Sequence, residues 1–202
     1  DTLAYMNGKD FNDYATVKDA TTGDLTKAKQ LWAKGLKEIG KKSVSISIMN
    51  NNDQTSRSVT EFLQTELEKL PGLKVNAEIL PNNVASGRSL KSDYELSVSG
   101  WDPSISDPIS PLQTKVSTSP INTSKWGNAM YDMYIDRSNN EDANNQNKRF
   151  FDLVNAQKVI LNDQGIIPLI QKAQPELMKT NIHGVKYLGN GPVWDFSHAY
   201  IK

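Results

Sequence analysis

The sequence contains no cysteine, and this absence removes several classes of functional site. Disulfide bonds, thiolate zinc sites and cysteine nucleophiles are all excluded. Only two histidines are present, His183 and His198, and neither has a second metal-ligating side chain four residues away. We therefore expect both histidines to be surface or loop residues, and we expect no metal and no cofactor.

The sequence also lacks an excess of charge and any long apolar run. Its 23 basic and 23 acidic residues give a formal net charge of +0, so there is no electrostatic case for a nucleic-acid partner, for which a basic face is expected. No apolar run approaches the about 18 residues of a membrane-spanning helix. The first ten residues have neither the basic nor the apolar region of a signal peptide, so we expect any export signal to lie upstream or to have been removed.

Hydrophobic periodicity predicts an alternation of helices and strands. The predicted elements are a helix at 25–39, a strand at 43–49, a helix ending before Pro71, strands at 73–80 and 94–101, helices at 128–138 and about 144–162, and a strand at 165–173. Residues 1–23 are expected to be an irregular lead-in, and residues 81–87 a turn. A helix joining two strands of one sheet implies a parallel crossover, so the predicted fold class is α/β.

The loop after the third predicted strand is the most informative stretch of the sequence. It reads SGWDPSISDPISPL over residues 99–112 and contains a tryptophan, two aspartates and three prolines. Loops at the carboxyl ends of parallel strands are where α/β sheets place ligands. Trp101 offers a flat apolar surface there, whereas Trp126 and Trp194 either extend that surface or cover the core.

Asp102 and Asp107 allow a catalytic interpretation of the same loop. Glycosidases use two carboxyl groups about 5–10 Å apart, and five residues separate these aspartates. Aspartate is also common in turns because it accepts hydrogen bonds from local amides, and the flanking prolines favour that role. The sequence contains no phosphate-binding loop, dinucleotide fingerprint, nucleophile elbow, HExxH or EF-hand pattern. We therefore favour ligand binding over catalysis and expect no enzyme; a structural or adhesion domain is a further alternative.

An ordered series of segments resembles a known family. The segments are DLTKAKQLWAKGLKEIG, VSISIM, YELSVSGWDPSISDPISPL, RFFDLVNAQKVILNDQGIIPLI and the ending WDFSHAYIK. Together they resemble the C-terminal lobe of the oligopeptide-binding proteins of ABC importers, the extracellular solute-binding proteins of family 5. The resemblance implies a type II periplasmic-binding-protein-like lobe, with a mixed sheet flanked by helices. It further implies that residues 1–202 form a single lobe of a larger two-lobed protein, in which about 170–202 return toward the missing N-terminal lobe.

The resemblance also implies a peptide held as an extended strand between two lobes. The positions that match the family's ligand-binding strand end and loop are Ser99, Gly100, Trp101, Asp102, Ser104 and Asp107. Family members that prefer short peptides carry an aspartate three residues after this tryptophan, and that aspartate pairs with the peptide α-ammonium. Ser104 occupies the position here and brings no charge.

Three outcomes remain open for recognition of the peptide amino terminus. Asp102 or Asp107 replaces the missing aspartate, or the site takes longer peptides that continue past this point, or the ligand is not a peptide. Asp107-Pro108 also matches a later Asp-Pro of the family, for which a turn role is expected. The alternative solutes on the same scaffold are a sugar, a metal chelate or a signalling peptide, and the few histidines argue against direct metal ligation.

The partners implied by the resemblance are a peptide ligand, the N-terminal lobe of the same protein and an ABC permease. The implied location is outside the cytoplasmic membrane, either on a lipid anchor at the surface of a Gram-positive cell or in a periplasm. The isolated lobe offers only half of the contact area of a closed site, so we expect it to bind peptide weakly.

Overall fold

The computed structural model describes residues 4–103, 105–170, 177–188 and 194–202. The chain divides into two compact units, which we call unit 1 and unit 2. Unit 1 comprises residues 1–20, 101–119 and 126–202, and unit 2 comprises residues 21–100 and 120–125. Each unit has a hydrophobic core of its own. In the part of the chain described here, no helix combines the length and the hydropathy needed to cross a membrane.

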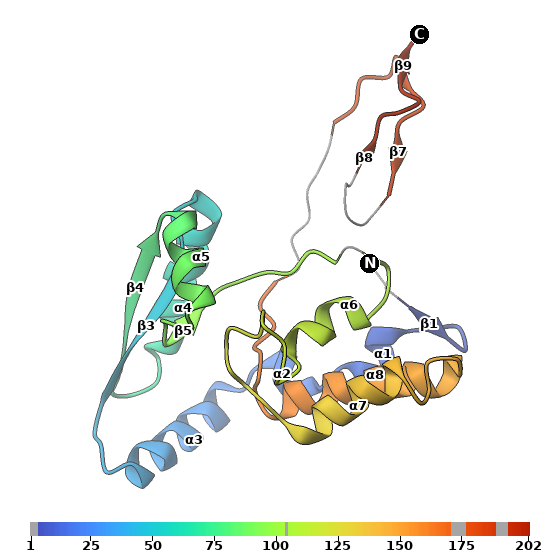
Figure 1. The fold of residues 1–202 in the computed structure, drawn as a ribbon. Helices are drawn as coiled ribbons and strands as arrows, with labels where there is room; N and C mark the ends of the chain where they lie inside the picture. Colours follow the sequence, from blue (N-terminus) through green and yellow to red (C-terminus); the bar gives the residue numbers. More distant parts are fainter. Residues whose placement is uncertain (1–3, 104, 171–176, 189–193) are drawn as a thin grey trace. The chain divides into compact units, whose positions relative to one another are not determined.

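Unit 2 is built on a three-stranded parallel sheet with the strand order β4-β3-β5 (Figure 1). Strand β3 (Val44–Asn51) pairs over its whole length with β4 (Leu73–Leu80) and at its end with β5 (Leu96–Ser97). Helix α4 (Gln54–Leu67) connects β3 to β4. The predicted parallel crossover is therefore confirmed.

The core of unit 2 follows from the alternation of side chains along these strands. Ile48, Leu73 and Val75 are buried, and apolar side chains of α4 and of helix α3 (Leu25–Glu38) pack against them. Asp24 and Asp53 cap the two helices by accepting hydrogen bonds from the backbone N–H groups three residues ahead. Both helices that the sequence predicts in this region are therefore present.

The third strand is much shorter than the predicted range 94–101. Only Leu96–Ser97 pairs with β3. One residue earlier, the Glu95 carboxylate accepts hydrogen bonds from the Ser47 backbone N–H at 2.6 Å and from the Ser47 hydroxyl at 3.0 Å. A side chain thus occupies the ladder position that backbone pairing would otherwise fill, so β5 begins only at Leu96.

The turn predicted at 81–87 is wrong, because this stretch lies in helix α5 (Asn82–Leu90). Pro81 precedes the helix in an extended conformation with ψ of 142°, and the missing proline N–H is not needed at that position. Ala85 is the buried apolar residue of α5. One small buried residue gives almost no helical periodicity, which is why the sequence pattern did not reveal the helix.

Unit 1 has a helical core, in which α7 (Ala129–Asn139) and α8 (Gln146–Asn162) form a hairpin (Figure 1). Both helices match the predicted ranges. Short helix α6 (Ile109–Leu112) and the 3₁₀ turn at Gln113–Lys115 complete this core together with residues near the N-terminus. Tyr131 is fully buried, and its hydroxyl donates to the Leu112 carbonyl at 2.6 Å.

The irregular lead-in predicted for residues 1–23 is wrong. Strands β1 (Tyr5–Met6) and β2 (Lys9–Asp10) form a hairpin, followed by helices α1 (Phe11–Ala15) and α2 (Lys18–Thr22). Asn7 and Gly8 form the two-residue turn with φ of 51° and 72°, as expected for an Asn-Gly hairpin. The Asn-Gly turn lies within a mostly polar stretch of sequence. Two apolar residues of that stretch, Phe11 and Ala15, are buried in the core of unit 1.

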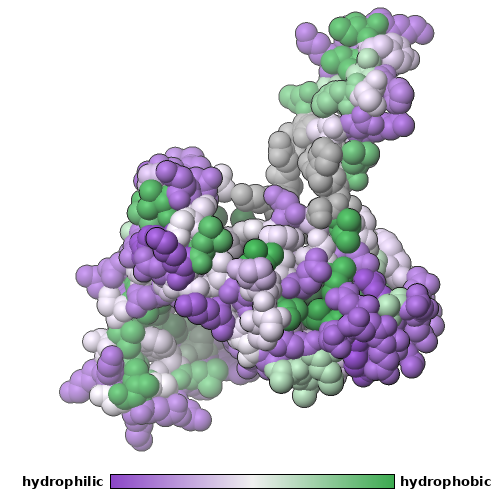
Figure 2. All heavy atoms as spheres, in the orientation of Figure 1, coloured by the Kyte–Doolittle hydropathy of each residue, from purple (hydrophilic) through white to green (hydrophobic). Residues whose placement is uncertain are grey.

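In the described residues from 177 onward, the strands form two short antiparallel pairs. Strand β6 (Ile182–His183) pairs with β9 (Tyr200–Ile201), and β7 (Lys186–Tyr187) pairs with β8 (Trp194–Asp195). The strand predicted at 165–173 is absent over 165–170, and its last three residues lie outside the described part of the chain. Figure 2 shows green, apolar side chains over this segment, and Leu177, Phe196 and Ile201 are among those exposed.

Candidate functional site

The predicted ligand-binding residues lie on both sides of the point where the chain passes from unit 2 to unit 1. Ser99 and Gly100 belong to unit 2, and both are exposed. They follow the carboxyl end of β5, the position that the sequence analysis expected. A Cβ atom added to Gly100 would meet nothing within 4 Å, so the backbone is open to close approach at this point.

Trp101 and Asp102 begin the unit 1 part of the loop, and both side chains are exposed. The Trp101 side chain is 52% exposed, which leaves a large apolar face in solvent. Ile105, which the sequence analysis did not single out, is also 52% exposed. Exposed apolar groups in a short loop are the kind of surface that a ligand covers. Ser104 lies outside the described residues.

Asp107 has both carboxylate oxygens engaged within unit 1. Its Oδ1 accepts a hydrogen bond from the Ile109 backbone N–H at 2.9 Å, which is the local turn chemistry of an Asp-Pro sequence. Its Oδ2 lies 2.9 Å from Nη1 of Arg149. The two side chains of this ion pair are only 28% and 26% exposed.

Arg149 and Lys148 are functional candidates that the sequence analysis missed. Both lie in the opening turn of α8, where cations oppose the helix dipole. Each has a carboxylate partner from outside the helix: Lys148 Nζ lies 3.5 Å from Asp142, and Arg149 pairs with Asp107. Two adjacent cations at the start of a predicted helix are the signal that could have pointed to these pairs.

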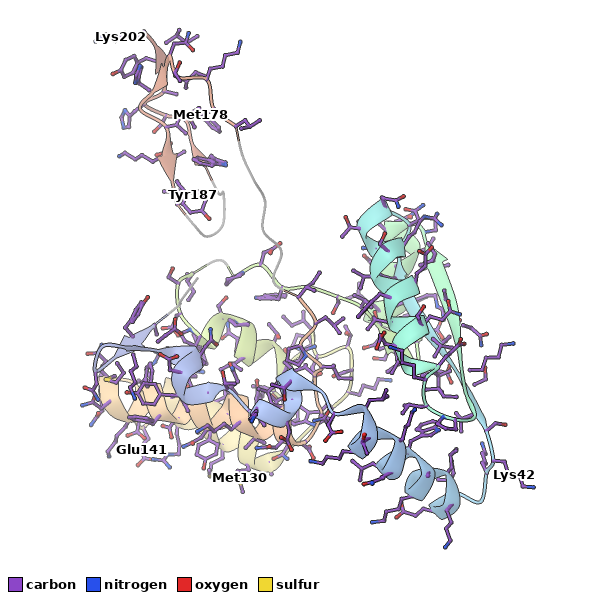
Figure 3. The ribbon with its side chains drawn as sticks, turned by 180° about the vertical axis from the view of Figure 1, so that it is seen from behind. Lys42, Met130, Glu141, Met178, Tyr187 and Lys202 are labelled. Atoms are coloured by element: carbon purple, nitrogen blue, oxygen red, sulfur yellow. The ribbon has the colours of Figure 1, made fainter. Side chains whose placement is uncertain are left out.

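Two carboxyl groups are buried in unit 1: Asp152 within α8, and Asp142 in the connection between α7 and α8, directly after Glu141, which Figure 3 labels. Burial raises the pKa of Asp152, and its hydrogen bond with Asp142 raises this pKa further, while Arg137 opposes both effects. Burial would also raise the pKa of Asp142, but hydrogen bonds from Arg137 and Asp152, together with Lys148, hold it below its usual range. The two neighbouring carboxyl groups therefore have pKa values displaced in opposite directions.

Trp126 and Trp194 each pack against a tyrosine ring. Trp126 donates through Nε1 to Asp163 at 2.8 Å, and its ring meets Tyr131 edge to face at 5.0 Å. These contacts agree with the core-covering interpretation of Trp126. Trp194 packs at 5.1 Å against Tyr187 within the β7–β8 pair.

The histidines form no metal site in the part of the chain that the structure describes. His183 stacks on Tyr200 across the β6–β9 pair at 5.4 Å, and His198 is exposed in a turn. No group of three or more histidine, cysteine, aspartate or glutamate side chains is placed to hold a metal ion among these residues.

Two hollows of about 370 and 410 Å³ lie along α7 and α8 in unit 1. Tyr134 and Asn155 line both of them. None of the predicted ligand-binding residues lines either hollow. Neither hollow therefore corresponds to the predicted site.

The chain matches a family model, curated relatives and solved structures. Residues 3–123 match the model of bacterial extracellular solute-binding proteins, family 5 Middle. A dipeptide-binding protein of Lactococcus lactis is 31% identical over 96% of this chain and 36% of its own length. An oligopeptide ABC transporter substrate-binding domain from Bacillus anthracis superposes with a TM-score of 0.88 at 28% identity, covering 98% of this chain and 39% of the other.

A second structure, Listeria monocytogenes OppA bound to peptide, superposes with a TM-score of 0.80 at 28% identity. It is matched over 96% of this chain and 36% of its own length, so the chain spans little more than a third of these relatives. The likeness confirms the predicted periplasmic-binding-protein-like fold, whose parallel and antiparallel strand pairs lie here in separate sheets. The family match covers more than half of the sequence, and the chain belongs to the bacterial extracellular solute-binding proteins of family 5.

Proposed function

We propose that this chain is part of the peptide receptor of an ABC importer and binds peptides without transforming them. The observation that carries the proposal is the exposed Trp101 loop, which follows the carboxyl end of β5. Relatives named as dipeptide- and oligopeptide-binding proteins match this chain along nearly all of its length. A peptide ligand fits both observations better than a sugar or a metal chelate does.

The proposed binding mode is pairing of an extended peptide with the backbone that leaves β5. Ser99 and Gly100 offer exposed main-chain groups, and Trp101 forms one wall of a side-chain pocket. Asp102 is the exposed carboxylate available to a peptide ammonium, since Asp107 is already paired with Arg149. Pro103 has no N–H, which limits how far such pairing extends.

The proposed domain assignment is a single lobe, residues 1–202, of a larger two-lobed protein. The chain covers only 36% of the Lactococcus relative, which leaves room for a second lobe. The last segment, from about residue 170, would return toward that N-terminal lobe. Its exposed Leu177, Phe196 and Ile201 support this assignment, because apolar side chains gathered on one segment are normally covered.

The proposed setting is outside the cytoplasmic membrane, with an ABC permease as the second partner. The family is one of extracellular solute-binding proteins. Retention by a lipid anchor on a Gram-positive cell, or enclosure in a periplasm, would each keep the receptor beside its permease.

A non-catalytic role is part of the proposal. A glycosidase that used Asp102 and Asp107 would need both carboxyl groups at the substrate. Asp107 is occupied by the Ile109 N–H and by Arg149, which leaves Asp102 without its proposed catalytic partner.

The test of the site is Trp101→Ala in the intact protein. Because the Trp101 side chain is 52% exposed, we expect little change in thermal stability but at least about a tenfold loss of peptide affinity by calorimetry. Phe62→Ala is the matched control, since Phe62 is an aromatic side chain on α4 that is 63% exposed, and we expect it to leave the affinity unchanged. An unchanged dissociation constant for Trp101→Ala would remove this loop from the binding site.

A further inference from the structure

We propose that Arg149 is a positioning residue for peptide binding, which acts by holding Asp107 and the loop that precedes it. This inference rests on the proposed function and assigns to Asp107 the turn role rather than direct ligand contact. The ion pair joins the end of the candidate loop to α8 within unit 1, at 2.9 Å between Arg149 Nη1 and Asp107 Oδ2.

The loop is firmly held on the C-terminal side of Asp107. The Asp107 carboxylate caps the Ile109 N–H, and the Ser110 N–H donates to the Asp107 carbonyl at 3.0 Å. Ile109 and Leu112 are each only 6% exposed and belong to the core of unit 1. Asp107 is therefore the junction between a buried helix start and the exposed residues before it.

The N-terminal side of the loop has little packing of its own. Trp101 and Ile105 are both 52% exposed, and Asp102 is exposed as well. Side chains that expose this much surface gain little from the core, so their geometry depends on the nearest anchored backbone. The Asp107 N–H donates to the Ile105 carbonyl at 2.9 Å, so the backbone of the exposed part is hydrogen-bonded directly to the anchored residue.

The placement of Arg149 on α8 supports a dedicated role. A cation in the opening turn of a helix is unfavourable in the field of the helix dipole, whereas an anion there would be favourable. The partner of Arg149 is a carboxylate from outside the helix, and both side chains are largely buried. A largely buried pair holds its geometry better than an exposed one, because it is less screened by solvent and salt.

The alternative is that Asp107 itself binds the peptide ammonium. That role would need a carboxylate oxygen free to face the ligand. Here one oxygen accepts from the Ile109 N–H and the other pairs with Arg149, so an approaching ammonium would compete with a guanidinium already in place. Positioning and direct contact predict different responses to a change in the peptide terminus.

The experiment uses the intact protein and the variants Arg149→Met, Arg149→Lys, Asp107→Asn and the double variant. We expect Arg149→Met to speed amide hydrogen exchange in fragments covering 101–112 and to weaken free and N-acetylated peptides equally, by about three- to tenfold. Arg149→Lys keeps the charge and should restore most of the affinity. The double variant should lose no more affinity than the worse single variant, because both changes break one pair.

Arg137→Met is the matched control, because it breaks another ion pair of unit 1, to Asp142 at 2.9 Å. It should lower stability without altering exchange at 101–112 or peptide affinity. Positioning is overturned if Arg149→Met lowers stability but changes neither quantity, or if Asp107→Asn weakens only peptides with a free amino terminus. A folded wild-type protein that binds no peptide would overturn the proposed function and with it the role of Arg149 in peptide binding. Hydrogen exchange at 101–112 would still decide separately whether Arg149 holds the loop.

Discussion

At the scale of single residues, the clearest electrostatic feature is the buried carboxyl pair of Asp142 and Asp152. Asp142 is 2% exposed and Asp152 is 5% exposed. Arg137 and Lys148 both form ion pairs with Asp142. Asp152 has a pKa raised above its ordinary value of 3.8, and Asp142 has one lowered below it. The two groups therefore affect stability in opposite directions as the pH changes.

The Asp152 contribution gives a testable pH dependence. Because its pKa is higher in the folded than in the unfolded state, the stability linked to its proton is complete below pH 3.8 and is lost as the pH rises through the raised value. We expect Asp152→Asn to remove this loss, since the new amide can donate to Asp142 at every pH. Denaturant unfolding between about pH 4 and pH 7 should show the variant gaining on the wild type as the pH rises.

Asp142→Asn is the paired control, with the opposite sign. The lowered pKa of Asp142 means that its stabilising contribution is present above pH 3.8 and is lost as the pH falls through the folded value. This variant should be less stable than the wild type at neutral pH and should approach it in acid. A difference between Asp152→Asn and the wild type that stays constant from about pH 4 to pH 7 would contradict a raised pKa for Asp152.

Residue identities could be predicted from the sequence only where the chemistry is local. The turn role of Asp107 follows from the neighbouring proline, and the structure shows its hydrogen bond to the Ile109 N–H. Its second partner, Arg149, is 42 residues away, and no local pattern identifies such a pair. The pairing of Asp142 with Asp152 could not be predicted from the sequence either, because it depends on burial in the folded protein.

At the scale of elements, Gly72 at the start of β4 is a sharp constraint on the parallel sheet. Its φ is +81°, and an added Cβ would lie 2.4 Å from the Lys42 carbonyl oxygen. We expect Gly72→Ala to destabilise unit 2 by more than the about 1–3 kcal/mol of a left-handed non-glycine residue, because the steric clash adds to it. Thermal or denaturant unfolding measures the loss.

Gly35→Ala is the matched control for this substitution. Gly35 lies inside α3, and an added Cβ would meet nothing within 4 Å. The same chemical change should therefore stabilise the protein by about 0.5–1 kcal/mol through helix propensity. Destabilisation by both substitutions, or by neither, would contradict the geometry described for the two glycines.

Long elements with clear periodicity were predicted well, and short ones were not. Helices α3, α4, α7 and α8 lie where apolar spacing placed them, because each packs several apolar side chains against the core of its unit. Helix α5 and the β1–β2 hairpin bury too few residues to leave a pattern. Strand β5 was overestimated because Glu95 replaces backbone pairing with a side-chain hydrogen bond, which alternation of residues does not reveal.

At the scale of the whole molecule, the family and fold could be predicted from the order of segments along the chain. The match to extracellular solute-binding proteins and the TM-score of 0.88 to a substrate-binding domain confirm them. The assignment of residues 1–202 to a single lobe stays a prediction, as do the six ligand-binding positions. A binding site closed by a second lobe depends on contacts that this chain does not contain.

The most direct test of the account is calorimetric titration of the intact protein with pools of short and long peptides, each free and N-acetylated. We predict tight binding of at least one pool, because Trp101 is exposed in the candidate loop and a relative of this chain is named as a dipeptide-binding protein. Binding that survives acetylation would show that the site, with Ser104 in place of the family's aspartate, does not depend on the peptide ammonium. Binding lost on acetylation would assign ammonium recognition to another carboxylate, with Asp102 as the first candidate. Absence of binding by every pool to the folded protein would contradict the peptide-receptor function.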